Sequence, residues 1–302
     1  MQLKTKISFL LVIIAIIYLG SLIIHQPFNN ERLLGQLAIS TFLLSLLPAV
    51  AMVFFAAAYH VLTVGRLSPN ATSRIRVMKA YSVSQVVRYL PGKIWGIVYE
   101  ANSLSREVSA KHVITANLMQ ALLTNLMAVG FSAIIIAFWL FQQVWILLLA
   151  PAVVIAIEFL HRKPLLERKA IALISRFLSR SNEELVFPPP LEFWATAMLI
   201  LEWAAFVVVW WLLLNHELMI NDILILSAYY AFASILSVAA LAVPGGIAIR
   251  EALFIGLASS IGIDQVALLG YAAAARIVFT AAEFFLVFLI YPLSMVYKWR
   301  QV

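Results

Sequence analysis

The sequence predicts an all-α fold, a polytopic helical bundle in a membrane, and three observations support that prediction. Hydrophobic residues make up 64% of the chain, charged residues make up 12%, and the mean hydropathy is +0.99, far from the usual balance of soluble domains. The apolar residues form several uncharged runs that reach the ~20 residues a helix needs to cross a bilayer. Each half of the chain also sets a helix-breaking Pro-Gly beside charged residues in apolar surroundings.

The first two expected elements lie before the first Pro-Gly. Residues 7–24 follow Lys4 and Lys6 as a signal peptide would. The run is nevertheless long enough to span, and no small-residue cleavage site follows it, so we expect a retained first helix. Residues 33–64 exceed one span, and we expect that helix to tilt or to kink at Pro48.

The later elements follow from the same rule. Residues 113–157 contain no charge and are too long for one crossing, so we divide this run at Gln142-Gln143. The remaining apolar helices are expected at 193–214, 223–243, 247–261 and 266–291. Asp264 is a candidate N-cap for the last of them.

The charge distribution indicates the orientation of the chain. The net charge is +7, and the basic residues gather in the loops 66–79 and 161–192, whereas Arg32 is the only Lys or Arg in the loops 26–32 and 215–222. Loops rich in Lys and Arg stay in the cytoplasm, so we expect both termini and the loop 161–192 on that side of the cytoplasmic (inner) membrane. The excess positive charge then contacts anionic lipid, and we expect no nucleic-acid partner.

This orientation constrains both Pro-Gly phrases. Residues 81–106 must enter and leave on the cytoplasmic side, as a re-entrant hairpin whose first helix, 81–90, brings Pro91 near the midplane. Around the second phrase, either one crossing plus a hairpin or three full crossings satisfy the topology. The alternatives are therefore six spans with two hairpins, or eight spans. With hairpins, 33–141 and 193–291 are inverted repeats within one transmembrane domain, 1–302, an arrangement typical of transporters.

The two phrases also resemble a known family. They are RYLPG at 88–92 with Trp95, and Pro244-Gly245-Gly246 followed by Arg250-Glu251-Ala252. Together they resemble the lysylphosphatidylglycerol synthase transmembrane region, a family of flippase-like bacterial and archaeal membrane proteins, over nearly the whole chain. In bifunctional members, the resemblance implies, this region moves aminoacylated phosphatidylglycerol across the bilayer, while a separate soluble domain makes that lipid.

Two departures from family patterns stand out. We expect this chain to lack the soluble aminoacyltransferase domain, since the sequence printed here ends soon after the last span. The family has Gly two positions after Pro-Gly-Gly, where this chain has Ala248. The first phrase is also similar to the Arg-aromatic-x-Pro-Gly of the DedA family of lipid carriers, but the second phrase does not fit that family.

An anionic lipid head group needs fixed donors to cross hydrocarbon. Suitable charges and half-helix starts lie at both phrases. The residues expected to line a head-group path are Arg88, Pro91, Gly92, Lys93, Glu202, Pro244, Gly245, Gly246, Arg250, Glu251, Arg276 and Glu283. The alternatives are structural: Arg88 and Lys93 snorkelling to cytoplasmic phosphates, and Arg250-Glu251 pairing locally.

The intramembrane charges of the last helix share one face. Arg276, Thr280 and Glu283 recur at i, i+4 and i+7, and ~10.5 Å of axial rise separates the Arg from the Glu. Each is therefore expected to meet a ligand or another helix. Glu202, within its span, is either protonated, paired with an Arg or facing water, in a transport path or in a buried structural pair.

Other polar residues in the spans are expected to be structural. The stripe Asn117, Gln120, Thr124 and Asn125 predicts hydrogen bonds between helices. We expect His60 to be a satisfied residue at a helix interface.

The sequence predicts a flippase-like transporter of a phosphate-bearing phospholipid or polyprenyl-phosphate lipid. It contains no phosphate-binding loop, zinc-protease or serine-hydrolase motif, and no Cys, so we expect no catalysis, cofactor or metal. Two alternatives stay open: a lipid-modifying membrane enzyme with Glu251 or Glu283 as the base, and an accessory subunit of an envelope-polymer assembly. A homo-oligomer or an envelope-biosynthesis partner is compatible with either.

Overall fold

The computed structural model describes residues 39–68, 73–89, 95–162, 193–215, 217–238 and 248–299. Every element within these ranges is a helix, and five of the helices are long and apolar enough to cross a membrane. The predicted all-α, polytopic bundle is confirmed at this level. The expected features outside the described residues are the helix 7–24, most of the loop 161–192, and Pro91, Gly92, Lys93, Pro244, Gly245 and Gly246.

The described chain begins with α3 (Ile39–Leu67), which continues through Pro48. The next helix, α4 (Arg74–Val87), corrects the expected helix 81–90, since it begins seven residues earlier and ends three earlier. The prediction began the helix at Tyr81, whereas Arg74, Arg76, Met78, Lys79 and Ala80 have good helix propensity and extend it toward the N-terminus. After the first Pro-Gly comes α5 (Trp95–Ser103).

The uncharged run 113–157 is divided where the sequence predicted. The helix α6 (Ala110–Phe141) begins at Ser109, whose side chain accepts a hydrogen bond from the backbone N–H of His112. It ends at Gln142, which adopts a left-handed conformation with φ of 52°. A 3₁₀ turn, η1 (Val144–Leu149), leads into α7 (Ala150–Arg162), so the helix runs two residues into the predicted loop 161–192.

The second half contains α9 (Phe193–Leu214), α10 (Ile220–Val238), α11 (Ile249–Ala258), the turn η3 (Ser259–Ile261) and α12 (Gln265–Trp299). The predicted N-cap is confirmed, because Asp264 Oδ2 accepts from the backbone N–H groups of Val266 and Ala267, each at 3.1 Å. The last helix was expected to end at 291 but continues through Pro292. A proline is tolerated in membrane helices because neighbouring groups satisfy the freed backbone.

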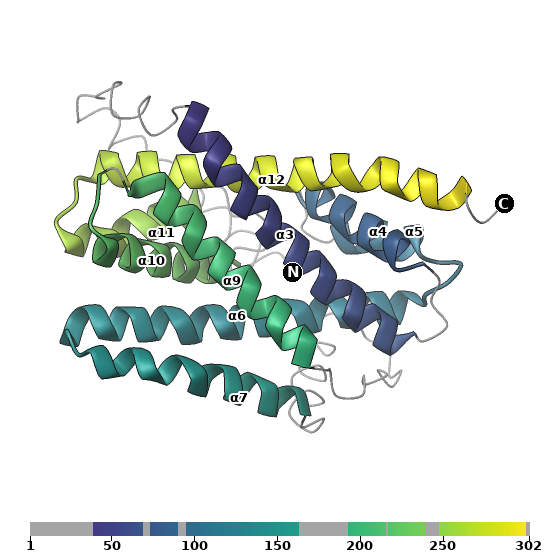
Figure 1. Cartoon of the computed structure of the whole chain (residues 1–302), viewed down its shortest axis with the longest axis horizontal. Coiled ribbons are helices and arrows are strands. Elements are labelled where there is room, and N and C mark those ends of the chain that lie inside the picture. Colours follow the sequence, from purple (N-terminus) through teal and green to yellow (C-terminus); the bar gives the residue numbers. More distant parts are fainter. Residues whose placement is uncertain are drawn as a thin grey trace, which may run out of the picture.

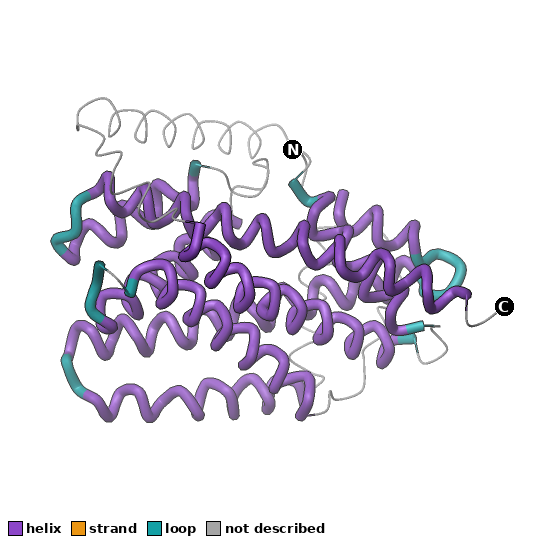
Figure 2. Tube along the Cα trace, turned by 45° about the horizontal axis from the view of Figure 1, so that its top comes forward, coloured by secondary structure: helices purple, strands orange, loops and turns teal. Residues whose placement is uncertain are grey.

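The longest helix, α12, organises the bundle (Figure 1). The α4–α5 pair packs beside the C-terminal part of α12, and the α10–α11 pair lies beside its N-terminal part. Helices α3 and α9 pack against each other between these two pairs, and α6 and α7 lie away from α12 in both views (Figure 2). The two pairs of shorter helices therefore pack against different parts of one helix.

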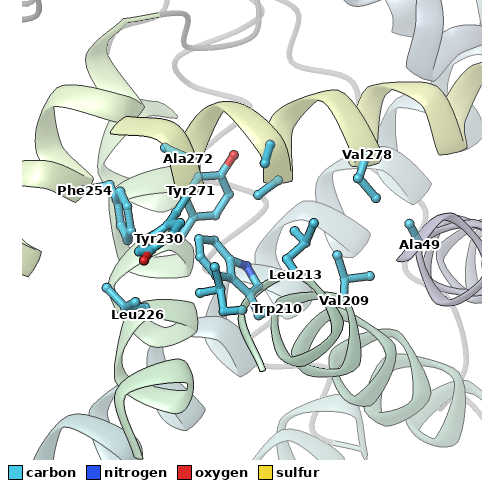
Figure 3. Packing of buried hydrophobic residues seen from close by; sticks show 14 of the residues in the cluster. Ala49, Val209, Trp210, Leu213, Leu226, Tyr230, Phe254, Tyr271, Ala272 and Val278 are labelled. Atoms are coloured by element: carbon cyan, nitrogen blue, oxygen red, sulfur yellow. The ribbon is translucent and has the colours of Figure 1, made fainter. Parts of the chain in front are cut away.

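The main core fills the space between α9, α10, α11 and α12. Figure 3 shows Trp210, Tyr230 and Phe254 converging below α12, with ring centroids 5.0 to 5.7 Å apart. Small residues such as Ala272 let α12 approach these rings closely. Because lipid tails are as apolar as these side chains, the association depends on close packing rather than on the hydrophobic effect.

A glycine sets the separation of the α4–α5 pair. A Cβ atom at Gly96 would lie 2.6 Å from the backbone oxygen of Ser84, closer than real Cβ contacts allow. The absence of a side chain at this position therefore permits the close approach of α5 to α4.

Candidate functional site

The first polar cluster ties the end of α4 to α12. Arg88 Nη2 pairs with Glu283 Oε1, and Arg88 Nη1 donates to Gln85 Oε1 at 2.7 Å. Next to this ion pair, Tyr89 Oη and Thr280 Oγ1 are 3.2 Å apart. The Glu283 side chain is only 7% exposed, whereas that of Arg88 is 46% exposed. The guanidinium is therefore neutralised on one side and accessible on the other. We call this contact the α4–α12 ion pair.

The second cluster joins α11 to α12. Arg276 Nη1 donates to Glu251 Oε1 at 2.6 Å, and Arg250 reaches the same oxygen at 3.5 Å. Arg250 also lies over the ring of Tyr230, with its Cζ atom 4.8 Å from the ring centroid, within range of a cation–π contact. The expected local pairing of Arg250 with Glu251 is thus the weaker of the two contacts. We call the Glu251–Arg276 contact the α11–α12 ion pair.

These two ion pairs show what the two charges on one face of α12 contact. Arg276 and Glu283 do not pair with each other, as their predicted separation required, and each meets a different helix. The partner of Glu283 comes from the first half of the chain, and the partner of Arg276 from the second half. The sign of the charge on α12 is reversed between the two contacts.

A third cluster is buried between α3, α4, α5 and α6. His60 Nε2 lies 2.6 Å from Glu100 Oε1, and His60 Nδ1 lies 2.9 Å from Gln120 Oε1. Asn117 donates to Glu100 Oε2 at 3.0 Å, and the ring of Tyr81 stacks on His60 with centroids 4.3 Å apart. The predicted interface roles of His60, Asn117 and Gln120 are confirmed. We call these five residues the His60 cluster.

Glu100 was missed by the sequence analysis. It is fully buried, as is His60, and it holds the cluster together from α5. The available signal was an acidic residue on a short helix that follows a Pro-Gly break in apolar surroundings. Such a residue needs a polar or charged partner inside the bundle. His60, on the neighbouring helix α3, is that partner.

A polar cavity of about 370 Å³ lies between α4, α5, α6 and α9. Its polar lining includes Gln85, Arg88, Asn117, Gln120, Thr124 and Glu202. Within the described part of the chain, Glu202 Oε2 and Thr124 Oγ1 are buried without a hydrogen-bond partner. Of the three alternatives for Glu202, the arrangement excludes a close pair with a described arginine, and the carboxyl group borders the cavity.

An apolar cavity of about 220 Å³ follows between α6, α9 and α10. Phe131, Ile135, Trp203 and Val207 are among its lining residues. Trp203 directly follows Glu202 on α9, so the polar and the apolar cavity succeed one another along the same two helices, α6 and α9. A ligand with a polar and an apolar part fits this order.

The start of α11 is strained. Ala248 has φ of 67° at the N-cap position, and the described residues show no side-chain hydrogen bond that caps this end. A positive φ costs an L-residue with a Cβ roughly 1 to 2 kcal/mol, which glycine avoids.

The structure thus brings together only some of the predicted site residues. Arg88 and Glu202 border one cavity, Arg88 pairs with Glu283, and Glu251 contacts two arginines, at a separate place on α12. Among the residues described, no group of three or more His, Cys, Asp or Glu side chains could hold a metal ion.

No protein-family model matches the chain, and no curated protein matches it either.

Proposed function

We propose that this protein is a flippase-like transporter that moves a phosphate-bearing lipid across the cytoplasmic membrane. The observation that supports it best is the polar cavity bordered by a half-exposed arginine, Arg88, inside a bundle of membrane-spanning helices. Ionisable groups inside a membrane bundle are costly and mark substrate pathways more often than not. The resemblance of both Pro-Gly phrases to the lysylphosphatidylglycerol synthase transmembrane region agrees with this proposal.

The head group is held by Arg88. A guanidinium presents several N–H donors in a planar fork that matches phosphate, and one side of this fork faces Glu283 and Gln85. A phosphate entering the cavity would bind the N–H donors on the exposed side of Arg88. It would compete with Glu283 for the donors on the other side. Glu251 and Arg276 form the next such contact, about two helical turns along α12.

The apolar cavity favours a lipid over a soluble anion. A phosphate bound near Arg88 would place an attached acyl or isoprenyl chain close to α6 and α9, where the lining changes to Phe131, Ile135 and Trp203. Apolar side chains contribute nothing to the binding of free phosphate, but they accept a hydrocarbon chain.

The proposed topology has two inverted repeats, 33–141 and 193–291, with both termini in the cytoplasm. The α4–α5 pair is the hairpin from inside, and the α10–α11 pair is the hairpin from outside. Helix lengths support this arrangement for three of the four helices: α4 has 14 residues, α5 has 9 and α11 has 10, all short of the ~20 that a span needs, whereas α10, with 19, is long enough to cross. Three full crossings would require α11 to span, although its ten residues reach only ~15 Å.

The test is reconstitution into vesicles that contain a fluorescent lipid and an external membrane-impermeant quencher. We expect protein-dependent movement of phosphatidylglycerol, aminoacylated or polyprenyl-phosphate lipid, and none of diacylglycerol, which lacks the phosphate. Replacing Arg88 with Gln removes charge-assisted hydrogen bonds of roughly 1.5 to 3 kcal/mol, so transport should slow about 10- to 100-fold. The control is Arg76→Gln, which loses a surface pair with Glu107 away from the cavity.

Other outcomes would contradict the proposal. Recovery of a chemically altered lipid would identify a membrane enzyme instead. No movement of any lipid in the panel, by protein that is folded and inserted, would leave an accessory subunit as the better description.

A further inference from the structure

We propose that the polar cavity binds a proton together with the phosphate group of the lipid, so that a proton gradient drives transport. The inference rests on the proposed function and names the ion coupled to it. The proton would reside on Glu202 and exchange with the His60–Glu100 pair behind the cavity wall.

Glu202 is the side chain that takes up the proton from the cavity. Its carboxyl group borders the cavity on α9, and Oε2 is buried without a hydrogen-bond partner among the described residues. Burying an unpaired carboxylate costs far more free energy than burying the neutral acid. A carboxyl group in this position is therefore suited to taking up a proton from water in the cavity.

The hydrogen bonds of the His60 cluster determine which nitrogen of His60 carries hydrogen. Gln120 Nε2 donates to the backbone oxygen of Ala56 and to Tyr81 Oη, each at 2.9 Å, which fixes the orientation of the amide. Gln120 Oε1 is then an acceptor, so the His60 Nδ1 that faces it must carry hydrogen. A neutral imidazole would consequently have no hydrogen on Nε2.

The 2.6 Å contact between His60 Nε2 and Glu100 Oε1 then requires one further proton. It belongs either to an imidazolium beside a carboxylate or to a neutral imidazole beside a carboxylic acid. Both residues are fully buried, and the side chains that hydrogen-bond to them, Asn117 and Gln120, also line the cavity. The pair thus stores a proton one side chain away from the water-accessible space.

The charges around the cavity couple this proton to the lipid. The ionisable groups on the cavity wall are Tyr81 on α4, Arg88 directly after α4, and Glu202 on α9. Behind the wall lie Glu100 on α5 and His60 on α3, while Glu283 on α12 reaches the cavity only through Arg88. The α6 side contributes neutral Asn117, Gln120 and Thr124, and Glu158 of α7 bonds instead to Thr196. A charged Glu202 repels an entering phosphate, and protonation removes that repulsion.

Coupling of this kind is reciprocal, so protons should strengthen lipid binding and lipid should strengthen proton binding. Lipid and proton would then move in the same direction. Typical coupling is about 5- to 150-fold in affinity, which sets the size of the expected effect.

The experiment uses the full chain in vesicles with a trapped pH dye and the fluorescent lipid. We expect a lower pH on the side from which the lipid starts to accelerate lipid movement about 5-fold or more, accompanied by proton flux in the same direction. Glu202→Gln fixes the neutral state, so whatever lipid movement this variant retains should not respond to the gradient and should carry no proton flux. Glu158→Gln is the matched control, because the same change on α7 lies outside the cavity, and it should respond like the original chain.

Two outcomes separate the inference from the proposed function. Lipid movement that ignores the gradient and carries no proton flux would overturn the proton site and leave the transporter. If no lipid moves, infrared difference spectra of the purified chain between acidic and alkaline pH test the site alone. A carboxylic-acid band that titrates, disappears in Glu202→Gln and shifts in His60→Gln would support it, and the absence of such a band would overturn it.

Discussion

At the scale of single residues, five of the charged side chains in the described bundle lie next to one of opposite sign and Glu202 lies next to a cavity; the five are Arg88, Arg250, Glu251, Arg276 and Glu283. Glu251 illustrates why this matters. Its Oε1 atom accepts from Arg276 at 2.6 Å and lies 3.5 Å from Arg250, while its Oε2 atom is buried without a partner among the described residues. One carboxylate between two arginines leaves a net positive charge, which suits an anionic ligand.

The Glu251–Arg276 pair predicts which second substitution restores the amount of protein in the membrane. Arg276→Gln leaves Glu251 with only the longer contact to Arg250, and breaking a buried pair costs roughly 3 to 5 kcal/mol. We therefore expect less protein in the membrane and a lower melting temperature. Adding Glu251→Gln should restore the protein level, whereas adding Glu283→Gln should lower it further, since Glu283 pairs with Arg88.

Transport by the restored variant decides the role of the pair. Arg276→Gln with Glu251→Gln should remain inactive in the vesicle assay if both residues line the path. Recovery of transport together with protein level would make the pair structural and remove both from the site.

The strain at Ala248 gives a second prediction at this scale. Ala248→Gly should leave the stability unchanged or raise it by up to ~1 kcal/mol, because glycine adopts the positive φ without strain but loses some chain entropy. Ala252→Gly, in the regular part of α11, should instead lower it by about 1 kcal/mol. Thermal unfolding of both variants in detergent measures the difference, and equal destabilisation would contradict the strained backbone.

At the scale of elements, the α4–α5 and α10–α11 pairs are held in place by contacts with neighbouring helices. The α4–α5 pair consists of helices too short to span, and it is fixed by Gly96 against Ser84, by the His60 cluster and by the α4–α12 ion pair. These contacts also form the walls of the polar cavity. The cavity should therefore respond to small changes in the separation of α4 and α5.

Gly96→Ala tests this dependence. The added methyl group would meet the backbone oxygen of Ser84 at 2.6 Å, so α5 must move and carry Glu100 away from His60. We expect a lower melting temperature and slower lipid movement. Gly256→Ala is the control, because a Cβ at that position of α11 meets nothing within 4 Å and alanine favours a helix by about 1 kcal/mol. Similar losses in both variants would mean that the close approach at Gly96 is unimportant.

At the scale of the whole molecule, α12 connects the two halves of the chain. Its Glu283 pairs with Arg88 near one break and its Arg276 pairs with Glu251 near the other, about two helical turns away. The corresponding helix pairs extend from there toward the two ends of α12 (Figure 1). In the proposed topology these ends face opposite sides of the membrane. A head group released from Arg88 would then travel along α12 toward Arg276.

Labelling of single cysteines tests this orientation, and the chain has no cysteine of its own. Gln142→Cys, in the exposed turn between α6 and α7, should react with an impermeant maleimide on intact cells. Ser105→Cys, in the exposed turn before α6, and Arg168→Cys, in the loop 161–192, should react only after the membrane is permeabilised. The opposite pattern would invert the topology.

The sequence by itself determined the features that depend on local chemistry. The span at 193–214, the division at Gln142 and the N-cap at Asp264 follow from uncharged length, a break between apolar runs and one side-chain acceptor. The start of α4 and the end of α12 were wrong because both helices continue beyond the predicted limits, through residues with good helix propensity before Tyr81 and through a tolerated proline at 292. The spacing of Arg276 and Glu283 also showed that they could not be partners.

The tertiary structure alone decided which groups meet. Nothing in the sequence assigns Glu251 to Arg276, joins Glu100 to His60 or puts Glu202 on the cavity that Arg88 borders. These contacts connect residues far apart in the chain, and they depend on how helices of similar apolar composition pack against one another. Hydropathy measures only the transfer of each helix into lipid, so it fixes which segments enter the membrane but not their neighbours.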